Sequence, residues 1–387
     1  MFGSTWNCVR RCGLQAPSVW RSLGTSSGEA VPGTLIPKEE VKRFVSDCMV
    51  KIGTPVNNAE ALAEVLISAD YRGHYSHGLN RLDLYVKDVS SKVCDSEVTP
   101  TIVKESAATG FINGNNGLGP VVGNFCMQLA IKKAKEAGVG WVVANNSNHY
   151  GIAGYYSLQA MEQKLIGMSF TNTSPFMVPT RSKVPALGTN PITVAAAGLG
   201  NDQFVLDMAT TAVAVGKIEL QRRKGEKIPY GWAQDKEGAV TTDSVAAMDA
   251  SCLMPLGGTE INSGYKGYGL GLMVELFCGI LAGSAYGPNI RKWMTATTPA
   301  NLGQCFVAVD PSCFAPGFEE RLSDIISQIK NLTPVDSSNP VLIAGEPEVS
   351  HMNKVDAAGG IRYHINQINA SKTMARDLGV QEMKSAA

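Results

Sequence analysis

Apolar residues recur at helical spacing in the first part of the chain. In residues 37–53 they recur every three or four positions, which predicts a helix that ends at Gly53. Residues 58–71 repeat this spacing, and Gly73 ends the second predicted helix. A third, short helix is expected at residues 82–86. The N-terminal part of the chain is therefore predicted to be helical.

Helical and extended patterns alternate in the middle of the chain. Residues 120–137 carry an apolar stripe, with Pro120 in the first turn and Gly138 as the C-terminal cap. Residues 139–144 are almost continuously apolar, which is typical of a buried strand. A polar loop, a helix and a second strand at residues 166–171 follow. This alternation of strand, loop, helix and strand predicts an α/β protein.

Further elements are expected toward the C-terminus. The expected strands cover residues 192–196, 204–206 and 306–309. The expected helices cover residues 212–224, 268–282 and 319–330. Flexible chain is expected at residues 1–33, at residues 243–262 and after Glu348.

The composition narrows the class of protein. Of the 387 residues, 44% are hydrophobic and 18% are charged, the profile of a soluble globular protein. The formal net charge of +0 argues against a nucleic-acid binder. The nine cysteines include no C-x-x-C pair, so we expect neither a disulfide scaffold nor a structural zinc site. The best candidate for a membrane span, residues 268–282, is short and contains Glu275, so we expect no span.

The first 28 residues differ from the rest of the chain. They contain three arginines and several serines, and no acidic residue precedes Glu29. This composition is typical of a mitochondrial presequence, with a disordered tail or a misassigned start as the alternative. The expected location is accordingly the mitochondrial matrix or the cytoplasm.

The clearest candidate chemistry lies between Arg72 and Arg81. The chain has five histidines, and both His74 and His77 lie in this segment. A histidine can exchange a proton near neutral pH, and an arginine can bind a carboxylate through two parallel hydrogen bonds. We expect His77 to act as the acid or base, Arg81 to bind the carboxylate of a small organic acid, and Arg72 to help with a second carboxylate. A histidine that bonds to backbone at a helix start is the alternative.

Asp70, His74 and His77 could instead hold a metal ion. Zinc bound on a helix favours two histidines four residues apart, as in H-E-x-x-H, whereas these two lie three apart without an adjacent glutamate. We expect no metal. A metal-dependent hydrolase that uses these three side chains is the alternative from another class of enzyme.

Two polar segments lie next to predicted strands. The run at residues 145–151 follows an apolar strand and contains His149, a second acid/base candidate, because functional groups gather at the carboxyl ends of strands. The alternative is a turn that is rich in Asn for conformational reasons. Thr189, in the predicted turn at residues 188–191, could offer its hydroxyl to a substrate, although Gly, Asn and Pro also favour turns by themselves.

Two further segments suggest a nucleotide. Asp207 stands at the end of an apolar run, where its carboxylate could orient a histidine or bind a ribose, while the threonines that follow could simply cap a helix. Lys266 and Gly267 open an apolar helix whose first amides could bind a phosphate, with close helix packing as the alternative. The sequence contains no strict G-x-G-x-x-G, so a standard Rossmann fingerprint would not bind this nucleotide.

Taken in order, these motifs resemble the type-2 malate/L-lactate dehydrogenase family over residues 34–350. The matching segments are residues 72–81, 116–119, 148–151, 175–179, 188–191, 207–211, 266–269 and 301–304. The resemblance implies a non-Rossmann α/β fold with a mixed, largely antiparallel central sheet flanked by helices, usually in a homodimer. It also implies NAD(P)-linked reduction of a 2-keto acid, or the reverse oxidation.

The resemblance also implies roles for individual residues. His77 and His149 match positions to which the acid/base role has been given, and Arg81 and Thr189 match positions that contact the substrate. The positions that match cofactor contacts are Thr173, Ser174, Asp207, Met208, Ala209, Lys266 and Gly267.

We therefore expect an NAD-dependent malate dehydrogenase, with NADP as the alternative cofactor and His77 favoured over His149 as the acid/base. Lactate, sulfolactate, ureidoglycolate, diketogulonate or a cyclic imino acid is the alternative substrate, and a catalytically silent binding protein is a further alternative. The expected regions are a presequence or tail at 1–33, an N-terminal helical region at 34–120 that packs with the C-terminal part, an NAD(P)-binding core at 121–310, and a C-terminal helix, strand and tail at 311–387.

Overall fold

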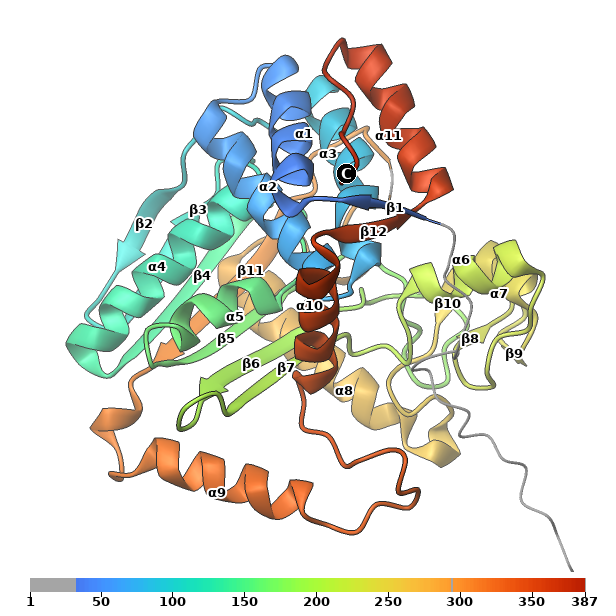
Figure 1. Cartoon of the computed structure of the whole chain (residues 1–387). Helices are drawn as coiled ribbons and strands as arrows, with labels where there is room; N and C mark the ends of the chain where they lie inside the picture. Colours follow the sequence, from blue (N-terminus) through green and yellow to red (C-terminus); the bar gives the residue numbers. More distant parts are fainter. Residues whose placement is uncertain (1–32, 294, 387) are drawn as a thin grey trace, which may run out of the picture.

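The centre of the fold is a seven-stranded sheet with helices on both faces (Figure 1). The computed structural model describes residues 33–293 and 295–386. The strands, in their order across the sheet, are β2 (Thr101–Glu105), β3 (Thr109–Asn113), β4 (Val139–Ser147), β11 (Leu302–Val309), β5 (Ile166–Thr171), β6 (Ile192–Ala197) and β7 (Gln203–Met208). Strands β3 and β4 are parallel, and the other described neighbours are antiparallel. The predicted class, a mixed and largely antiparallel non-Rossmann sheet, is confirmed.

Apolar side chains of the central strands are buried on both faces of the sheet. Val142 of β4 and Phe306 of β11 pack in one core, whereas Val143 and Val307, their neighbours along the chain, pack in another. This division follows from the two-residue period of a strand. The helices that cover the two faces are α4 (Gly119–Ala137) and α5 (Gly154–Met161) on one side and α8 (Gly264–Glu275) on the other.

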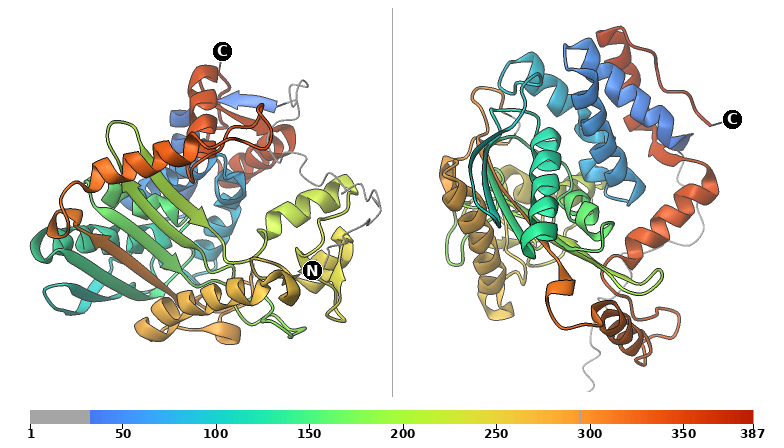
Figure 2. Two further views of the ribbon diagram at one scale, coloured as in Figure 1. Left: turned by 90° about the horizontal axis from the view of Figure 1, so that it is seen from below. Right: turned by 90° about the vertical axis from the view of Figure 1, so that its left-hand side faces the viewer.

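A third core lies beside the sheet, where the N-terminal and C-terminal segments meet (Figure 2). Phe44, Leu62 and Ile368, from three different helices, are buried in it. The elements of this region are β1 (Gly33–Ile36), α1 (Lys38–Lys51), α2 (Val56–Tyr71), α3 (Leu82–Ser90), α10 (Glu346–Ala358), β12 (Ile361–His364) and α11 (Ile365–Leu378). Strands β1 and β12 pair antiparallel. Segments from both ends of the described chain thus surround residues 72–81.

A smaller unit projects beside the main sheet (Figure 1). Its core includes Ile218, Ile228 and Leu253. The elements of this unit are α6 (Val215–Lys224), β8 (Ala233–Gln234), β9 (Val240–Thr241), α7 (Ser244–Ala250) and β10 (Cys252–Leu253). A further helix, α9 (Phe318–Lys330), lies on the outside of the molecule.

The strongly periodic segments are confirmed, with shifts at their ends. The helix predicted at residues 120–137 is α4, and Gly138 ends it with a φ of 82°. The strand predicted at residues 139–144 is β4, which continues to Ser147, so residues 145–147 extend the strand instead of opening a loop. The apolar helix α8 begins earlier than predicted and continues into a π-helical turn at Leu276–Ile280.

Two predictions of flexible chain are wrong. Residues 243–262 contain α7 and β10, and the chain after Glu348 forms most of α10, then β12 and α11. Ile361, Tyr363 and Ile368 are buried against the N-terminal helices, so long-range packing orders a segment whose local pattern is weak. Strands β2 and β3 were not predicted. Of the tail expected at residues 1–33, Gly33 begins β1, and residues 1–32 lie outside the described residues.

Two predictions from composition can be compared with the fold. In the part of the chain that the structure describes, no helix is long and apolar enough to cross a membrane. The seven cysteines of this part are free thiols, and six of them are buried. Burial of small sulfur-containing side chains in apolar cores is their usual environment.

Candidate active site

The segment between α2 and α3 carries the predicted histidine and arginine motif. Two short 3-10 turns, Tyr75–His77 and Leu79–Arg81, lead into α3. The buried carboxylate of Asp70 fixes this segment: its Oδ2 accepts a hydrogen bond from the backbone N–H of Leu79 at 2.8 Å and another from the hydroxyl of Tyr363 at 2.7 Å. The contact with Tyr363 ties the motif to β12.

Gly78 leaves room for the Asp70 carboxylate, and the substitution Gly78→Ala is expected to disrupt the motif. A Cβ atom at this position would lie 1.8 Å from Oδ1 of Asp70. Overpacking of a buried site costs about 1–3 kcal/mol, and a displaced Asp70 would also move His77. Because a shift of about 1 Å at a reacting group can cost roughly 100-fold in rate, we expect a clear fall in both Tm and turnover.

A matched control lies next to the same motif. A Cβ atom at Gly216, in α6, would meet Ser76 at 3.4 Å, which is an ordinary contact. Gly216→Ala should keep activity and gain up to about 1 kcal/mol of stability, because alanine favours a helix. If Gly78→Ala matched the unsubstituted protein in calorimetry and in activity, the anchoring role of Asp70 would be wrong.

The imidazole rings of His77 and His149 lie face to face. Their centroids are 6.0 Å apart, and the angle between their planes is 18°. Both residues are partly exposed, so the protein encloses the rings while a small molecule can still reach them. The fold therefore brings together the two histidines that the sequence offered as alternatives.

A hydroxyl group holds Nδ1 of each ring. The hydroxyl of Ser76 lies 2.8 Å from Nδ1 of His77, and the hydroxyl of Tyr85 lies 2.6 Å from Nδ1 of His149. Burial raises the pKa of Tyr85, so its phenol keeps its proton near neutral pH. A hydroxyl can donate to Nδ1 or accept from it, so either ring can change its charge without losing this contact. Neither Nε2 bonds to a residue in the described part of the chain, which leaves both for a ligand.

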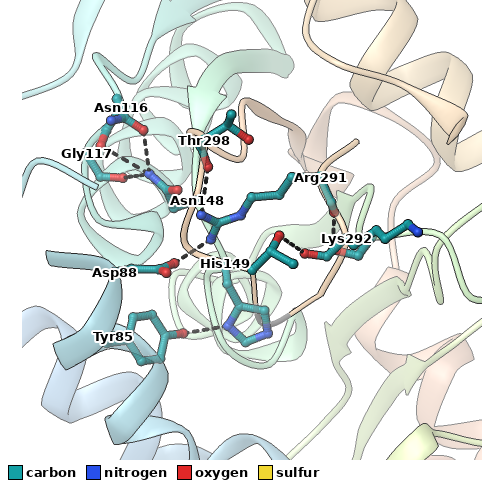
Figure 3. Close-up of polar contacts among 11 residues, drawn as sticks. Tyr85, Asp88, Asn116, Gly117, Asn148, His149, Arg291, Lys292 and Thr298 are labelled. Carbon is teal, nitrogen blue, oxygen red and sulfur yellow. Dashed lines mark hydrogen bonds and ion pairs between the residues drawn. The ribbon is translucent and has the colours of Figure 1, made fainter. Parts of the chain in front are cut away.

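Contacts of the neighbouring Asn148 fix His149 beyond the end of β4. The amide nitrogen of Asn148 donates to the carbonyl oxygens of Asn116 at 3.1 Å and Gly117 at 2.9 Å (Figure 3). The backbone carbonyl of Asn148 accepts a hydrogen bond from the side chain of Gln304 in β11 at 3.0 Å. His149 thus stands at the carboxyl end of a strand, as the sequence predicted.

The surroundings lower the pKa of both histidines. Burial is the main cause, and the positive charge of Arg81 adds to it. The pKa of His77 is lowered to about 4, and that of His149 lies well below its usual value. Both rings are therefore neutral near pH 7 in the free protein. A carboxylate bound to Arg81 would offset its positive charge and raise both pKa values again.

The guanidinium of Arg81 is held in one plane beside the histidines. Its Nε donates to the backbone carbonyl of Ser76 at 2.6 Å. Its two terminal nitrogens make no hydrogen bond to any residue that the structure describes. Those nitrogens carry the paired N–H groups that bind a carboxylate with two parallel hydrogen bonds. The structure therefore leaves the carboxylate-binding edge of Arg81 available, as the predicted role requires.

Arg72 and His74 face α10. The Nη1 atom of Arg72 lies 3.5 Å from the sulfur of Met352, and Nε2 of His74 lies 3.6 Å from a carboxylate oxygen of Glu348. Asp70, His74 and His77 thus contact three different groups, and the described residues contain no group of three or more His, Cys, Asp or Glu side chains that could hold a metal ion. The role of Arg72 toward a second carboxylate stays a prediction.

Three loops predicted to bind substrate or cofactor meet at one end of the sheet. The N–H of Thr189 donates to Oγ1 of Thr173 at 3.0 Å, and the hydroxyl of Thr210 donates to the carbonyl of Thr189 at 3.0 Å. The side-chain oxygen of Asn190 accepts the N–H of Thr173 at 3.1 Å, and its nitrogen donates to the buried carboxylate of Glu275 at 2.9 Å. We call Thr173, Thr189 and Thr210 the hydroxyl cluster, and Asn190 ties it to Glu275.

Asp207, Met208 and Ala209 lead into this cluster. Asp207 and Met208 are the last residues of β7, and Ala209 follows them. The carboxylate of Asp207 accepts the N–H of Gly154, the first residue of α5, at 2.9 Å. The carboxylate is thus fixed in orientation at the end of the strand, beside the hydroxyl cluster.

Lys266 and Gly267 lie in the first turn of α8. A Cβ atom at Gly267 would lie 2.3 Å from the carbonyl oxygen of Leu256, so only glycine allows this close packing. The N–H of Leu256 in turn donates to the carbonyl of Thr210 at 2.9 Å. The start of α8 is therefore joined to the hydroxyl cluster, and the exposed side chain of Lys266 stands near it.

Residues 291–293, which we call the wall segment, lie beside His149. Figure 3 shows Arg291 and Lys292 of this segment near the imidazole. The centroid of the Trp293 ring lies 5.4 Å from that of His149, and the guanidinium carbon of Arg81 lies 5.6 Å from the Trp293 ring. The backbone carbonyl of Arg291 accepts a hydrogen bond from the hydroxyl of Ser174 at 2.8 Å. The wall segment thus connects Ser174 with the histidine pair.

Sequence reasoning missed Tyr85, Asp88 and Trp293. Tyr85 lies in the short helix predicted at residues 82–86, where the pattern marks it only as an apolar position. Asp88 follows one turn later. A buried carboxylate indicates a functional or structural partner, but burial cannot be read from the sequence. Trp293 lies in irregular chain that gives no periodic pattern.

Comparison with known proteins identifies the family. The family model described as malate/L-lactate dehydrogenase matches residues 36–370. The chain belongs to the malate/L-lactate dehydrogenase family. The family description and the relatives named malate dehydrogenase and L-sulfolactate dehydrogenase indicate that this chain is a dehydrogenase that acts on the CH–OH group of a hydroxy acid, and a nicotinamide cofactor is implied.

Individual relatives cover nearly the whole family region. A malate dehydrogenase of Pyrococcus abyssi is 39% identical over 352 residues, which are 90% of this chain and 96% of the relative. An L-sulfolactate dehydrogenase of Methanocaldococcus jannaschii is 38% identical over 348 residues, which are 89% of this chain and 98% of the relative. The solved structure of malate dehydrogenase from Pyrococcus horikoshii OT3 gives a TM-score of 0.84 at 35% identity and covers 92% of this chain and 99% of that one.

The residues at this end of the sheet fit a nicotinamide cofactor of such a dehydrogenase. Thr173 and Thr189 are partly exposed, and their hydroxyls suit the polar groups of a dinucleotide, while Lys266 at the start of α8 suits a phosphate. The glycine contacts at Gly188 and Gly267 are too close for any side chain: a Cβ at Gly188 would lie 2.1 Å from Oγ1 of Thr173. The histidine pair adjoins this region through the wall segment.

Proposed function

We propose that the protein is an NAD-dependent malate dehydrogenase that interconverts malate and oxaloacetate. The observation that carries the proposal is the position of two neutral imidazoles, His77 and His149, beside the guanidinium of Arg81. Such a site suits a reaction that moves one proton on a small carboxylic acid. The relatives named malate dehydrogenase support malate, while the relative named L-sulfolactate dehydrogenase supports a wider class of short acids.

Substrate binding begins at Arg81. Its terminal nitrogens bind the C1 carboxylate, while the bond from Nε to the Ser76 carbonyl keeps the guanidinium from turning. The hydroxyl of Thr189 is the second substrate contact in this proposal. With C1 held, the C2 hydroxyl of malate faces the Nε2 edge of the histidine pair.

Oxidation of malate then needs one base. As the C2 hydride leaves, Nε2 of one imidazole takes the hydroxyl proton and the C2–O bond becomes a carbonyl. The hydride acceptor would be the nicotinamide of the cofactor when it is bound. A ring that acts as base at Nε2 carries its hydrogen on Nδ1, so the hydroxyl of Ser76 or Tyr85 accepts from Nδ1–H both before and after the proton is taken up.

Only one histidine of the pair is expected to carry the proton at a time. The rings are 6.0 Å apart, and each positive charge lowers the pKa of the other. The second, neutral ring can donate one hydrogen bond to the C2 oxygen and so orient it. His77 remains the favoured base, because Ser76 and Arg81 of its own motif position both it and the carboxylate.

A panel of three 2-oxo acids and one cyclic imino acid tests the proposal. Oxaloacetate, pyruvate, sulfopyruvate and a cyclic imino acid are each assayed with NADH and with NADPH by the loss of absorbance at 340 nm, with and without a chelator. We expect the highest kcat/KM with oxaloacetate and NADH, unchanged by the chelator. A higher value for another acid would replace malate as the substrate. If the chelator abolished activity, or if no acid led to oxidation of NADH or NADPH, the proposed dehydrogenase mechanism would be overturned.

Cofactor choice, assembly and location stay predictions. NAD over NADP and the homodimer rest on resemblance to the family. The mitochondrial matrix rests on the composition of residues 1–28, and the relatives named above, which come from archaea, give it no support.

A further inference from the structure

We propose that Trp293 determines substrate size, and that the ion pair between Asp88 and Arg291 holds it in place. In this view the indole is a wall of the substrate pocket that admits 2-oxo acids with a short polar side chain and excludes bulky ones. The inference rests on the proposed function for the substrate class. The position of Trp293 in the site can be tested separately, without turnover.

The first observation is a buried ion pair. Arg291 and Asp88 form a salt bridge whose side chains are only 13% and 10% exposed. The same guanidinium donates through Nη1 to the carbonyl of Thr298 at 2.9 Å, so it is also tied to its own loop (Figure 3). A buried pair of this kind is costly to break, because the remaining charge is left without a partner. Arg291 therefore has one strongly preferred position.

The second observation concerns the backbone of Arg291. Its carbonyl accepts the hydrogen bond from Ser174, so Arg291 is held at its side chain by Asp88 and at its main chain by Ser174. Trp293 follows two residues later. Because the chain is held at Arg291, the indole of Trp293 has little freedom to move away from the histidine pair.

The third observation is where the indole lies. It packs against His149 at 5.4 Å between centroids, with 58° between the ring planes, and the guanidinium of Arg81 lies 5.6 Å from the ring. One side chain thus contacts both the candidate acid/base and the group that binds the carboxylate. A cation placed near an indole is attracted to it, which also restrains Arg81. Any substrate held by Arg81 next to His149 must lie close to Trp293.

Helix α3 links the position of Trp293 to the orientation of His149. Tyr85, which holds Nδ1 of His149, and Asp88, which holds Arg291, are three residues apart in α3 and so lie on the same face. A single rigid helix therefore sets both the orientation of the imidazole and the position of the indole. The fold therefore fixes the distance between His149 and Trp293. This distance sets the space that is left for the substrate.

The size of the expected effect follows from pocket energetics. One methylene group more or less in an apolar pocket changes kcat/KM by roughly 10–200-fold. Trp293→Ala opens a larger space, so the ratio of kcat/KM for phenylpyruvate to that for oxaloacetate should rise at least about tenfold. Trp293→Phe keeps an aromatic wall and should move the ratio much less. Trp141→Phe is the matched control, because Trp141 packs against Phe277 in the core.

Binding provides the readout that does not need turnover. Malonate, an unreactive dicarboxylate, should change the tryptophan fluorescence of the protein in a saturable way. We expect this change to disappear in Trp293→Phe and to persist in Trp141→Phe. If malonate gave the expected pattern but no 2-oxo acid were reduced, the position of Trp293 in the binding site would be supported and the proposed function would be wrong. If folded Trp293→Ala kept the substrate ratio within about twofold, or the signal survived in Trp293→Phe, the inference would be overturned.

The ion pair is tested by a double-mutant cycle. Asp88→Asn should raise the KM for oxaloacetate about tenfold, with kcat within about threefold and the dissociation constant of NADH unchanged. Asp88→Asn combined with Arg291→Gln should be no worse than either single variant, because the two residues act as one unit. Additive effects, or equal effects on NADH binding and on KM, would show a general structural role and would contradict positioning.

Discussion

Replacing His77 or His149 by alanine is expected to lower kcat by roughly 10²–10⁴-fold, the usual contribution of general acid–base catalysis. The larger loss identifies the ring that carries the proton, and we expect it at His77. The smaller loss belongs to the ring that orients the C2 oxygen. NADH binding, measured by fluorescence titration, should survive in both variants, since neither ring is needed for the hydroxyl cluster or for Lys266.

The pH dependence gives a second measure of the same prediction. Oxidation of malate needs a neutral imidazole, and the pKa of His77 is lowered to about 4. The kcat/KM for malate should therefore stay level from pH 7 down to about pH 5 and fall only below that. An unperturbed histidine would already cost about tenfold at pH 5.5, because its pKa is roughly 6.5. Reduction needs the protonated ring, so kcat/KM for oxaloacetate should fall as the pH rises.

A suitable control is His364→Asn. His364 is exposed and caps α11 by accepting the N–H of Asn366, and asparagine preserves such a cap. This variant should behave like the unsubstituted protein. Full activity in both the His77 and the His149 variants would remove the proposed mechanism.

Arg81→Gln is expected to lower kcat/KM for malate by roughly 30-fold to several thousand-fold. Truncating one partner of a desolvated, hydrogen-bonded charge pair costs about 2–5 kcal/mol, and each 1.4 kcal/mol is about tenfold. Most of the loss should lie in KM, because Arg81 binds the carboxylate before and during the reaction. Arg81→Lys should restore only part of it, since an ammonium group cannot form two parallel hydrogen bonds in one plane.

The loss of this charge should also be visible in the pH profile. Arg81 is the second cause of the lowered pKa of His77, after burial. In Arg81→Gln the low-pH limb of kcat/KM should therefore move upward, toward the usual histidine value. Arg321→Gln, on the exposed face of α9, serves as the control. An Arg81→Gln enzyme with unchanged KM for malate would rule out Arg81 as the carboxylate ligand.

The fold was predictable where the local pattern is strong. Helix α4 shows its stripe, its Pro120 and its terminal Gly138 in the sequence alone, and β4 follows as a continuous apolar run. The C-terminal elements β12 and α11 were not predictable in this way. Their stability comes from burial against α1 and α2, which lie at the other end of the chain. A local pattern carries no information about such partners.

For the site, the sequence by itself determined which chemical groups are present. It offered His77, His149, Arg81, Thr173, Thr189 and Lys266, and the order of the motifs was specific enough to indicate the family. Tertiary structure decided which of these groups meet. The stacked histidines, the hydroxyls of Ser76 and Tyr85 behind them, and the wall formed by Trp293 all depend on contacts between segments far apart in the sequence. Burial shifts a pKa and sets the shape of a pocket, and burial exists only once the chain has folded.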